Sequence, residues 1–516
     1  MAGPGSYGRL AWAAAVLIRA DALAPRELDP MLPPPARALA RLLRLASGPA
    51  ARSGRPGERL AAALEKLGPV GIKLGQFLST RADIFGAAFA EDLARLKDRL
   101  APFPTEQARA IVAASLGRPI EDVFSEFGEA IAGASLAQAH PARLNDGRRV
   151  AVKVLRPRIE AKVAADAQVL RAAARLAESW APAARRLEPV AFAETVVRAL
   201  SLELDLRYEA AGADELRAVM AFDALMGAPA VVWAGVARRV LTLEWAAGAP
   251  LSDPDSLAQP GLDCAALAKN LTRGFLVQAL DHGIFHADLH EGNLFVAAPA
   301  RLTAVDFGII GRLGADERRY LAEILWGFLR RDYGRVADMH FEAGYVSAAH
   351  DRGAFAQALR AVGEPIVGLK ASEVSMGRLL AQLFEITALF DMRLRPELVL
   401  LQKTMVTVEG VARRIDPGHD IWAAAEPVVA RGIARELSPL AHVRRLAVDA
   451  RAALAALARE GEAAQARPRA TATAGAPPAP AERRDATHPA VWFFAGAAMS
   501  ALGFSLAVLV RLVGAR

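Results

Sequence analysis

The 516-residue sequence predicts an α+β protein of two lobes, with a helical N-terminal extension and a C-terminal transmembrane helix. Three observations predict this organisation. Short apolar strands, helical segments and polar motifs follow one another in a fixed order between residues 126 and 425. The residues before them are typical of helices broken by prolines. The charge-free stretch 489–510 is long enough to cross a bilayer.

The most informative polar motif runs from Phe285 to Asn293 and is soon followed by Asp306-Phe307-Gly308. The two runs have the forms H-x-D-x-x-x-x-N and D-F-G, in the order and approximate spacing that protein kinases use. Phosphoryl transfer needs a carboxylate near the attacking oxygen, here Asp288. It also needs oxygen ligands that hold Mg²⁺ against the phosphates, here Asn293 and Asp306. The motifs predict a bilobal protein-kinase-like fold that uses ATP and Mg²⁺.

The same run allows two other interpretations. His286, Asp288 and His290 are ligand types for iron or zinc, but a metal cluster would leave Asn293 and the D-F-G run unexplained. A polar turn between two strands would account for either run alone. The two runs in order favour the kinase-like interpretation.

A third motif, Val150 to Val154, has the form of the kinase strand whose lysine holds the α- and β-phosphates, here Lys153. A single lysine in an apolar strand is more often an edge residue whose ammonium group reaches water. The kinase-like interpretation needs a partner glutamate on a downstream helix. The segment 201–209 offers both Glu203 and Glu209.

Two further segments are expected to complete the nucleotide site. Residues 240–248 form a strand that enters a turn of small residues, so backbone groups of Glu244 to Ala246 should face the adenine edge. No G-x-G-x-x-G precedes Lys153, and the run in its place is rich in alanine, which restricts the backbone more than glycine does. The phosphates should therefore be held differently from those of an ordinary protein kinase. This run supplies the candidate nucleotide-binding residues Gly133, Ala134, Ser135, Leu136 and Ala137.

These motifs resemble those of the UbiB family of atypical protein-kinase-like proteins, the ADCK group. The segment Lys73-Leu74-Gly75-Gln76 matches the family's K-x-G-Q motif. Glu203 and Asp205 match its E-x-D motif, and Glu209 matches the glutamate that pairs with the strand lysine. The resemblance covers roughly residues 30 to 425. Gly133 departs from it, because many members have Ala or Ser at that position.

The resemblance implies an ATPase or atypical kinase that supports isoprenoid-quinone (ubiquinone) biosynthesis. It implies that the K-x-G-Q segment folds over the nucleotide site, with Lys73, Gly75 and Gln76 regulating it beside Glu203 and Asp205. The implied partners are polyprenyl phenol or other quinone-precursor lipids and proteins of the quinone pathway. Direct hydroxylase chemistry is not expected, because the sequence lacks a flavin-binding G-x-G-x-x-G after a strand and a convincing iron triad.

Composition divides the chain into six segments. The predicted segments are a helical extension with the K-x-G-Q motif (1–125), a small lobe with inserted helices (126–250), a helical large lobe (251–425), a basic helical segment (426–461), a disordered linker (462–488) and a transmembrane segment (489–513). The linker is too poor in large apolar residues to form a core.

The tail predicts a membrane anchor. Residues 489–510 carry no charged side chain, and ~22 helical residues span ~33 Å, about the thickness of the hydrocarbon layer. A buried soluble helix is the alternative. Arginines before the tail outnumber those after it, which places the catalytic domain on the cytoplasmic side of a bacterial inner membrane. The length fits one span or a re-entrant hairpin. Gly496 and Ser500 share a helix face and would allow a homodimer.

Net charge and cysteine content limit the classes of binding partner and the cellular compartment that the sequence favours. The net charge of +7 comes mostly from arginines spread over helices, which favours an anionic membrane surface over nucleic acid. The single Cys264 excludes an internal disulfide and suits a reducing compartment.

Three other functions remain open. A small-molecule phosphotransferase of the aminoglycoside or choline kinase type would share Asp288, Asn293 and Asp306, but the K-x-G-Q and E-x-D motifs argue against it. Retention of Lys153 and the three polar residues argues against a non-catalytic scaffold for quinone-pathway enzymes. The alanine-rich run and the long N-terminal extension argue against a conventional protein kinase.

Overall fold

The computed structural model describes residues 4–436 with internal gaps. The gaps are residues 23–24, 32–33, 48–53, 80–86, 95, 97–100, 181–187, 365–385, 387–388, 391 and 393–395. The predicted linker and transmembrane segment lie outside the described residues, as does most of the basic segment 426–461. Within the described ranges, no helix combines the length and the apolarity that a bilayer span requires.

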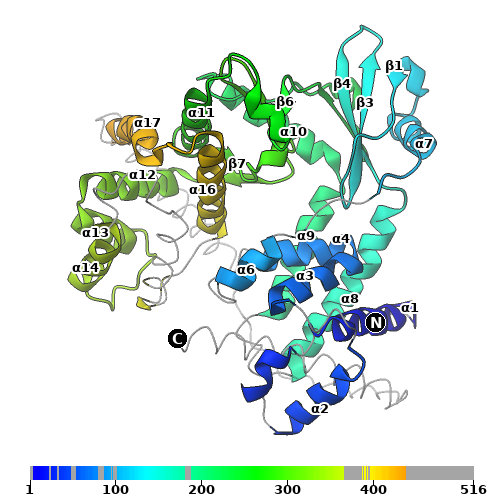
Figure 1. Ribbon diagram of the computed structural model, residues 1–516, viewed down its shortest axis with the longest axis horizontal. Helices are drawn as coiled ribbons and strands as arrows, with labels where there is room; N and C mark the ends of the chain where they lie inside the picture. Colours follow the sequence, from blue (N-terminus) through cyan, green and yellow to red (C-terminus); the bar gives the residue numbers. More distant parts are fainter. Residues whose placement is uncertain are drawn as a thin grey trace, which may run out of the picture.

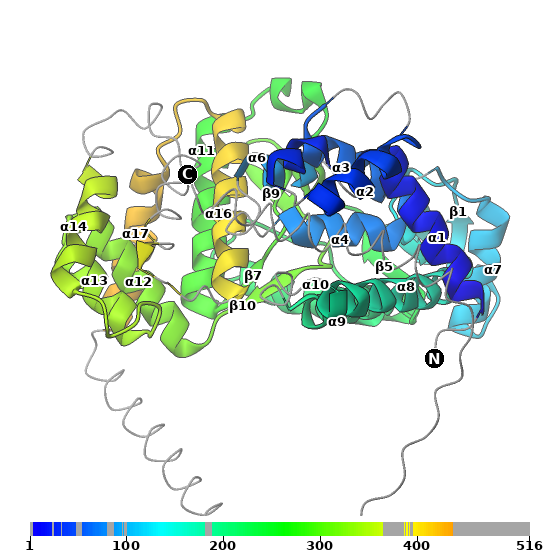
Figure 2. The ribbon, with the colours of Figure 1, turned by 90° about the horizontal axis from the view of Figure 1, so that it is seen from below.

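The N-terminal extension is helical, as the sequence predicts. Its helices are α1 (Pro4–Arg19), α2 (Pro34–Arg44), α3 (Pro56–Leu67), α4 (Pro69–Ser79) and α6 (Ala87–Ala94), with the 3₁₀ helix η1 (Arg26–Met31). All but α6 begin at a proline, whose fixed φ suits the first helical turn and whose missing N–H costs nothing there. Leu64 of α3, Leu93 of α6 and Leu96 are buried together. A small separate core therefore holds α3, α4 and α6 as one layer (Figures 1 and 2).

The small lobe is built on an antiparallel sheet. Its strands are β1 (Phe124–Phe127), β2 (Ala132–Gly133), β3 (Ala137–Leu144), β4 (Arg149–Leu155) and β5 (Val240–Glu244), in the order β1-β3-β4-β5 with β2 paired to β3. Helix α7 (Thr105–Leu116) and the 3₁₀ helix η3 (Ile120–Asp122) precede the sheet. Val150, Val152 and Val154 are buried against α7. Because side chains alternate along a strand, the residues between them face the other side of the sheet.

Three helices follow β4 and connect the sheet to the N-terminal extension. They are α8 (Ile159–Trp180), α9 (Pro189–Glu203) and α10 (Leu206–Met220). Helix α1 packs on α8, and α4 packs on α8 and α9. Figures 1 and 2 show the N-terminal helices gathered beside α8 and α9 rather than beside the large lobe. The K-x-G-Q motif on α4 is thereby brought next to the E-x-D motif at the end of α9.

The large lobe is mostly helical. Its helices are α11 (Cys264–Val277), α12 (Ala315–Arg330), α13 (Tyr333–Glu342), α14 (Arg352–Gly363), α16 (Pro396–Ile415) and α17 (Ile421–Glu436). Shorter helices of this lobe are η6 (Pro254–Ala258), the π-helix η7 (Gln278–His282) and η8 (Glu291–Asn293), whereas η5 (Trp233–Gly235) packs on β5 in the small lobe. Two small antiparallel sheets carry the catalytic motifs, one of β7 (Ile284–His286) with β10 (Ile310–Arg312), the other of β6 (Ala249–Pro250), β8 (Leu294–Ala297) and β9 (Arg301–Ala304).

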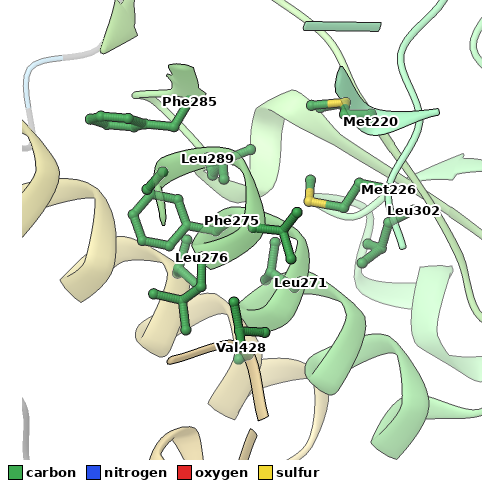
Figure 3. Close-up of a cluster of buried hydrophobic side chains, with 14 of the residues drawn as sticks. Met220, Met226, Leu271, Phe275, Leu276, Phe285, Leu289, Leu302 and Val428 are labelled. Atoms are coloured by element: carbon green, nitrogen blue, oxygen red, sulfur yellow. The ribbon is translucent and has the colours of Figure 1, made fainter. Parts of the chain in front are cut away.

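Two cores hold the large lobe together, one under α13 and α14 around Phe355 and a larger one around the loop that follows β7. Phe275 and Phe285 meet edge to face with ring centroids 5.7 Å apart, a favourable aromatic geometry. Leu276 and Leu289 lie beside them, and Val428 of α17 reaches the same cluster (Figure 3). The loop after β7 is therefore anchored in the centre of the lobe.

Two predicted domain boundaries differ from the structure. The boundary at 425 falls inside α17, because Val428 and Val429 are buried in the large-lobe core, so this lobe continues to at least Glu436. The boundary at 125 falls inside β1, and α7 before it packs on the sheet. Composition did not reveal either point, because arginines on the outer face of α17 hide its apolar inner face.

Candidate nucleotide and metal site

Lys153 lies on the face of β4 that points away from α7. Its Nζ is 2.8 Å from Glu209 Oε1 and 2.9 Å from Glu209 Oε2. The same Nζ is 3.2 Å from Asp306 Oδ1. The predicted contact between Lys153 and Glu209 is therefore present, and the D-F-G aspartate joins it.

Glu209 reaches Lys153 because of where α10 begins. Asp205 is the N-cap of α10, and its Oδ1 accepts the amide hydrogen of Arg207 at 3.2 Å. An aspartate at this position satisfies one of the free N–H groups of the first turn. Glu209 lies one turn further along and is only 9% exposed. The cap thus fixes the direction in which the Glu209 carboxylate points.

Asp306 adopts a left-handed backbone with φ of 61°, a conformation that non-glycine residues other than Asn and Asp seldom adopt. The charge of Lys153 lowers the pKa of Asp306 to about 2. Asp306 is therefore a carboxylate at every physiological pH, as a ligand for a hard cation must be.

The loop that carries Asp288 is held by its own backbone and by Asn293. Asn293 Nδ2 donates to the Asp288 carbonyl oxygen at 3.0 Å. The amide of Val305 donates to the Asn293 carbonyl oxygen at 2.9 Å. These two bonds connect the H-x-D-x-x-x-x-N run directly to the residue before Asp306. The three polar residues of the prediction are thus gathered at one end of the two small sheets.

His286 is part of this framework rather than a metal ligand. Its Nδ1 accepts the Asp288 amide at 3.1 Å, and its Nε2 lies 3.0 Å from the Val305 carbonyl oxygen. This pattern assigns the proton to Nε2, and burial lowers the pKa of His286 so that it stays neutral. Both ring nitrogens are used, and in the described part of the chain no group of three or more His, Cys, Asp or Glu residues has a metal-binding arrangement. The alternative interpretation as an iron or zinc cluster therefore has no geometric support.

The charges around Lys153 leave an excess of carboxylates. Burial opposes the charge on Lys153, but Asp306 and Glu209 outweigh it and raise the lysine pKa. Burial raises the pKa of Glu209 to about 7 even though Lys153 opposes that rise. Two carboxyl groups sharing one ammonium cannot both be fully compensated. Asp306 stays ionised and Asn293 offers an amide oxygen, and such hard oxygen ligands suit Mg²⁺, so the residues present fit the metal that the sequence predicts.

The alanine-rich run forms a tight turn between β2 and β3. The amide of Ala134 donates to the Ala137 carbonyl oxygen at 2.8 Å. Arg156, which directly follows β4, holds this turn, with its amide donating to the Leu136 oxygen at 2.8 Å and its Nε donating to the Ala134 oxygen at 2.9 Å. Ser135, Leu136 and Ala137 are buried. Sequence reasoning missed Arg156, although its position three residues after Lys153, at the end of the strand, is a usable signal.

The expected adenine edge is partly occupied by the fold itself. The amide of Glu244 donates to the Ala230 oxygen at 2.8 Å, and the amide of Trp245 donates to the Arg149 oxygen at 3.0 Å. The carboxylate of Glu244 binds Arg148, with 2.7 Å between Nη1 and Oε1. The predicted backbone contact with adenine therefore cannot use the first two amides, and Ala246 offers the next one along the chain.

The K-x-G-Q motif lies against the site, on α4. The ammonium group of Lys73 forms an ion pair with Glu203 at the end of α9. Burial raises the pKa of Glu203, and Lys73 opposes that rise. The charges of Asp306 and Lys153 also act on this carboxyl group, so it lies close to both. Lys73 is therefore placed beside the predicted nucleotide site.

The other residues of the predicted regulatory set, Asp205, Gly75 and Gln76, make contacts unlike the ion pair of Lys73. Asp205, which was expected beside Lys73 with Glu203, has a carboxylate that caps α10 and binds Arg207, with 2.6 Å between Oδ2 and Nη2. Gly75 serves close packing, since a Cβ there would lie 2.1 Å from Leu96 Cδ1. The backbone oxygen of Gln76 accepts a hydrogen bond from Ser79 Oγ at 2.7 Å. A regulatory role for Gly75 and Gln76 stays a prediction.

Comparisons with known proteins agree with this geometry. Residues 95–340 match the family model described as the ABC1 atypical kinase-like domain, and residues 359–420 match that of the UbiB helical domain. The chain is 39% identical over 395 residues to "Probable protein kinase UbiB" of Marinobacter nauticus, covering 76% of this chain and 72% of the relative. It is 40% identical over 390 residues to the protein of the same name from Pseudomonas putida, covering 75% and 72% of the two chains.

A solved structure, the complex of Rv3197 with erythromycin from Mycobacterium tuberculosis, has a TM-score of 0.48 to this chain at 20% sequence identity, covering 71% of this chain and 90% of that one. The family models and the identity to the two relatives confirm the resemblance that the motifs predict. The chain is an atypical kinase-like protein and belongs to the UbiB family.

Proposed function

We propose that this protein is a membrane-anchored atypical kinase or ATPase that binds Mg·ATP and supports ubiquinone biosynthesis. Its role there is regulation or lipid handling, rather than hydroxylation itself. The observation that carries the proposal is the contact of Lys153 with both Glu209 and Asp306. A scaffold that had lost nucleotide chemistry would have no need to keep a half-buried lysine between two carboxylates, one of which, Glu209, is itself buried and therefore costly to desolvate.

The residues have distinct roles in this proposal. Asn293 and Asp306 would hold Mg²⁺ through oxygen, and the bound cation would offset the charge on the phosphates of ATP. Lys153, oriented by Glu209, holds the α- and β-phosphates. Asp288 orients the oxygen of the acceptor, and the hydrogen bond from Asn293 to its backbone fixes the loop. The acceptor is a protein, a lipid or water.

The decisive experiment is ATP turnover by the purified full-length protein. We expect Mg²⁺-dependent hydrolysis that rises when a phenolic polyprenyl lipid or anionic liposomes are added. Absence of turnover under all of these conditions would favour the scaffold. Phosphorylation of small alcohols such as choline or an aminoglycoside would favour the small-molecule phosphotransferase instead.

Lys73→Ala is expected to change nucleotide behaviour, because it frees Glu203 and opens the space that α4 occupies beside the site. We expect autophosphorylation to increase, as measured by ³²P incorporation. We also expect the affinity for ATP to change, as measured by nucleotide titration. Lys66→Ala is the matched control, since Lys66 is an exposed lysine in the last turn of α3. If both variants match wild type in autophosphorylation and in ATP affinity, Lys73 has no regulatory role.

The tail is expected to anchor the protein. Truncation after Glu462 should move it from the membrane fraction to the soluble fraction while ATP binding is kept, because the described site residues lie between Lys73 and Asp306. Each large apolar residue near the centre of the span makes the free energy of membrane insertion more favourable by about 0.3–0.6 kcal/mol. A truncated protein that stays with the membrane in high salt would place the anchor elsewhere, with residues 10–18 as the next candidate.

A further inference from the structure

Helix α16 reaches the catalytic loop from outside the kinase-like domain. It lies within residues 359–420, which match the UbiB helical domain, whereas the loop lies within the kinase-like match at 95–340. Thr404 Oγ1 on α16 is 3.0 Å from the carbonyl oxygen of Ala287, the residue before Asp288. The Thr404 side chain is almost fully buried, with an exposed fraction of 1%. This contact joins two parts of the chain that are 117 residues apart.

The hydrogen bonds of Ala287 and Asp288 show why this contact matters. The amide of Ala287 donates to the Ile309 oxygen at 3.1 Å, and the amide of Asp288 donates to His286 Nδ1 at 3.1 Å. The Asp288 oxygen accepts from Asn293. All three partners belong to the kinase-like domain. The remaining group, the Ala287 oxygen, has its partner on α16.

Removal of the Thr404 hydroxyl would leave the Ala287 oxygen buried without that donor. A buried carbonyl without a donor is costly, so the loop would shift to find another partner or water. The hydroxyl of Thr404 has one proton, which it shares between the Ala287 oxygen at 3.0 Å and the Leu400 oxygen one turn earlier in α16 at 2.8 Å. Loss of the loop contact would leave the Thr404 hydroxyl bonded to Leu400. Breaking the contact between Thr404 and Ala287 should therefore disturb the loop that carries Asp288 and leave α16 unchanged.

A second contact between the same two elements lies nearer the surface. Arg414, in the last turn of α16, forms an ion pair with Glu291 on the far side of Asp288. Both side chains are about one-third exposed, at 36% and 37%, and ion pairs of this kind contribute little by themselves. Together the two contacts hold the loop at both ends, and the buried hydroxyl is the stronger of them.

We propose that Thr404 is a positioning residue for Asp288, through which the helical domain sets the geometry of the catalytic loop. The proposal rests on the proposed function, because it assigns Asp288 a role in turnover. Thr404 acts through the backbone of Ala287, so it should affect the placement of the acceptor and leave the binding of ATP unaffected. Changes in the packing of α16 would then alter turnover without touching the nucleotide.

Thr404→Val tests the proposal, because valine keeps the shape and removes the hydroxyl. We expect kcat to fall about tenfold or more, since small displacements of a catalytic group are costly, with KM for ATP unchanged. Thr404→Ser restores the hydroxyl and should recover most of the lost kcat. Thr407→Val is the matched control, because among the residues that the structure describes the Thr407 hydroxyl bonds within α16, to the Lys403 oxygen at 3.0 Å.

Amide hydrogen exchange of a peptide covering residues 284–293 gives a readout that needs no turnover. We expect faster exchange of this peptide in Thr404→Val, and wild-type exchange in Thr404→Ser and Thr407→Val. Unchanged exchange and unchanged kcat in Thr404→Val would overturn the proposal, as would equal losses in Thr404→Val and Thr407→Val. If the wild-type protein shows no ATP turnover while the peptide still exchanges faster in Thr404→Val than in wild type, the proposed function is refuted and the structural contact stands.

Discussion

Asp306→Asn should abolish ATP turnover and weaken the binding of Mg·ATP. Asparagine keeps the shape of the side chain and tolerates the left-handed backbone at this position, so the fold should be preserved. The substitution removes the negative charge that a hard divalent cation requires. It also removes one of the two carboxylates that contact Lys153. We expect a fall in kcat of at least about a hundredfold, as is found when one preorganised charge-stabilising group is lost.

The measurement is a Mg²⁺ titration of ATP hydrolysis together with the shift in Tm that Mg·ATP produces. Asp214→Asn is the matched control, because Asp214 is an exposed aspartate on α10 and should behave like wild type in both assays. Wild-type hydrolysis by Asp306→Asn would show that the kinase-like assignment of the site is wrong.

The second large effect is expected at the ion pair between Lys153 and Glu209. Lys153→Ala leaves Glu209 as a buried carboxyl group without its partner, and Glu209→Ala leaves Lys153 free to stay with Asp306. Each variant should weaken nucleotide binding by about tenfold or more, which corresponds to about 1.4 kcal/mol. Because the two side chains act as one unit, the double variant should lose less than the sum of the two single losses.

A double-mutant cycle on nucleotide affinity measures this coupling. Arg171 and Glu194 form a comparable pair on α8 and α9, with 2.7 Å between Nε and Oε1, and alanine variants of that pair should leave nucleotide affinity unchanged. If the losses in nucleotide affinity of Lys153→Ala and Glu209→Ala add exactly, the two side chains do not act as a pair, and Glu203 is the next partner to test.

Much of the site could be predicted because its motifs are local. Asp288, Asn293 and Asp306 lie on short segments whose residue types reflect phosphoryl transfer. The choice between Glu203 and Glu209 was open from spacing alone, and the family resemblance favoured Glu209. The structure confirms Glu209, because the break between α9 and α10 places Glu203 at the end of one helix and Glu209 in the first turn of the next.

The role of Asp205 was also decided by the structure. The resemblance grouped Asp205 with Glu203 through the E-x-D motif, but an aspartate that begins a helix is satisfied by the free amides of that helix and here also by Arg207. The predicted membrane segment falls on residues that the structure does not describe, so it stays a prediction.

The sequence by itself determined the class of the fold, the order of its lobes and the polar residues of the site, because strand alternation and motif chemistry are properties of neighbouring residues. Only the tertiary structure decided that Asp306 joins the pair of Lys153 and Glu209, that α17 belongs to the large lobe, and that Thr404 contacts the residue before Asp288. These contacts join residues far apart in the chain. Their identity depends on how whole helices pack, and packing is settled by the shape and burial of many side chains at once.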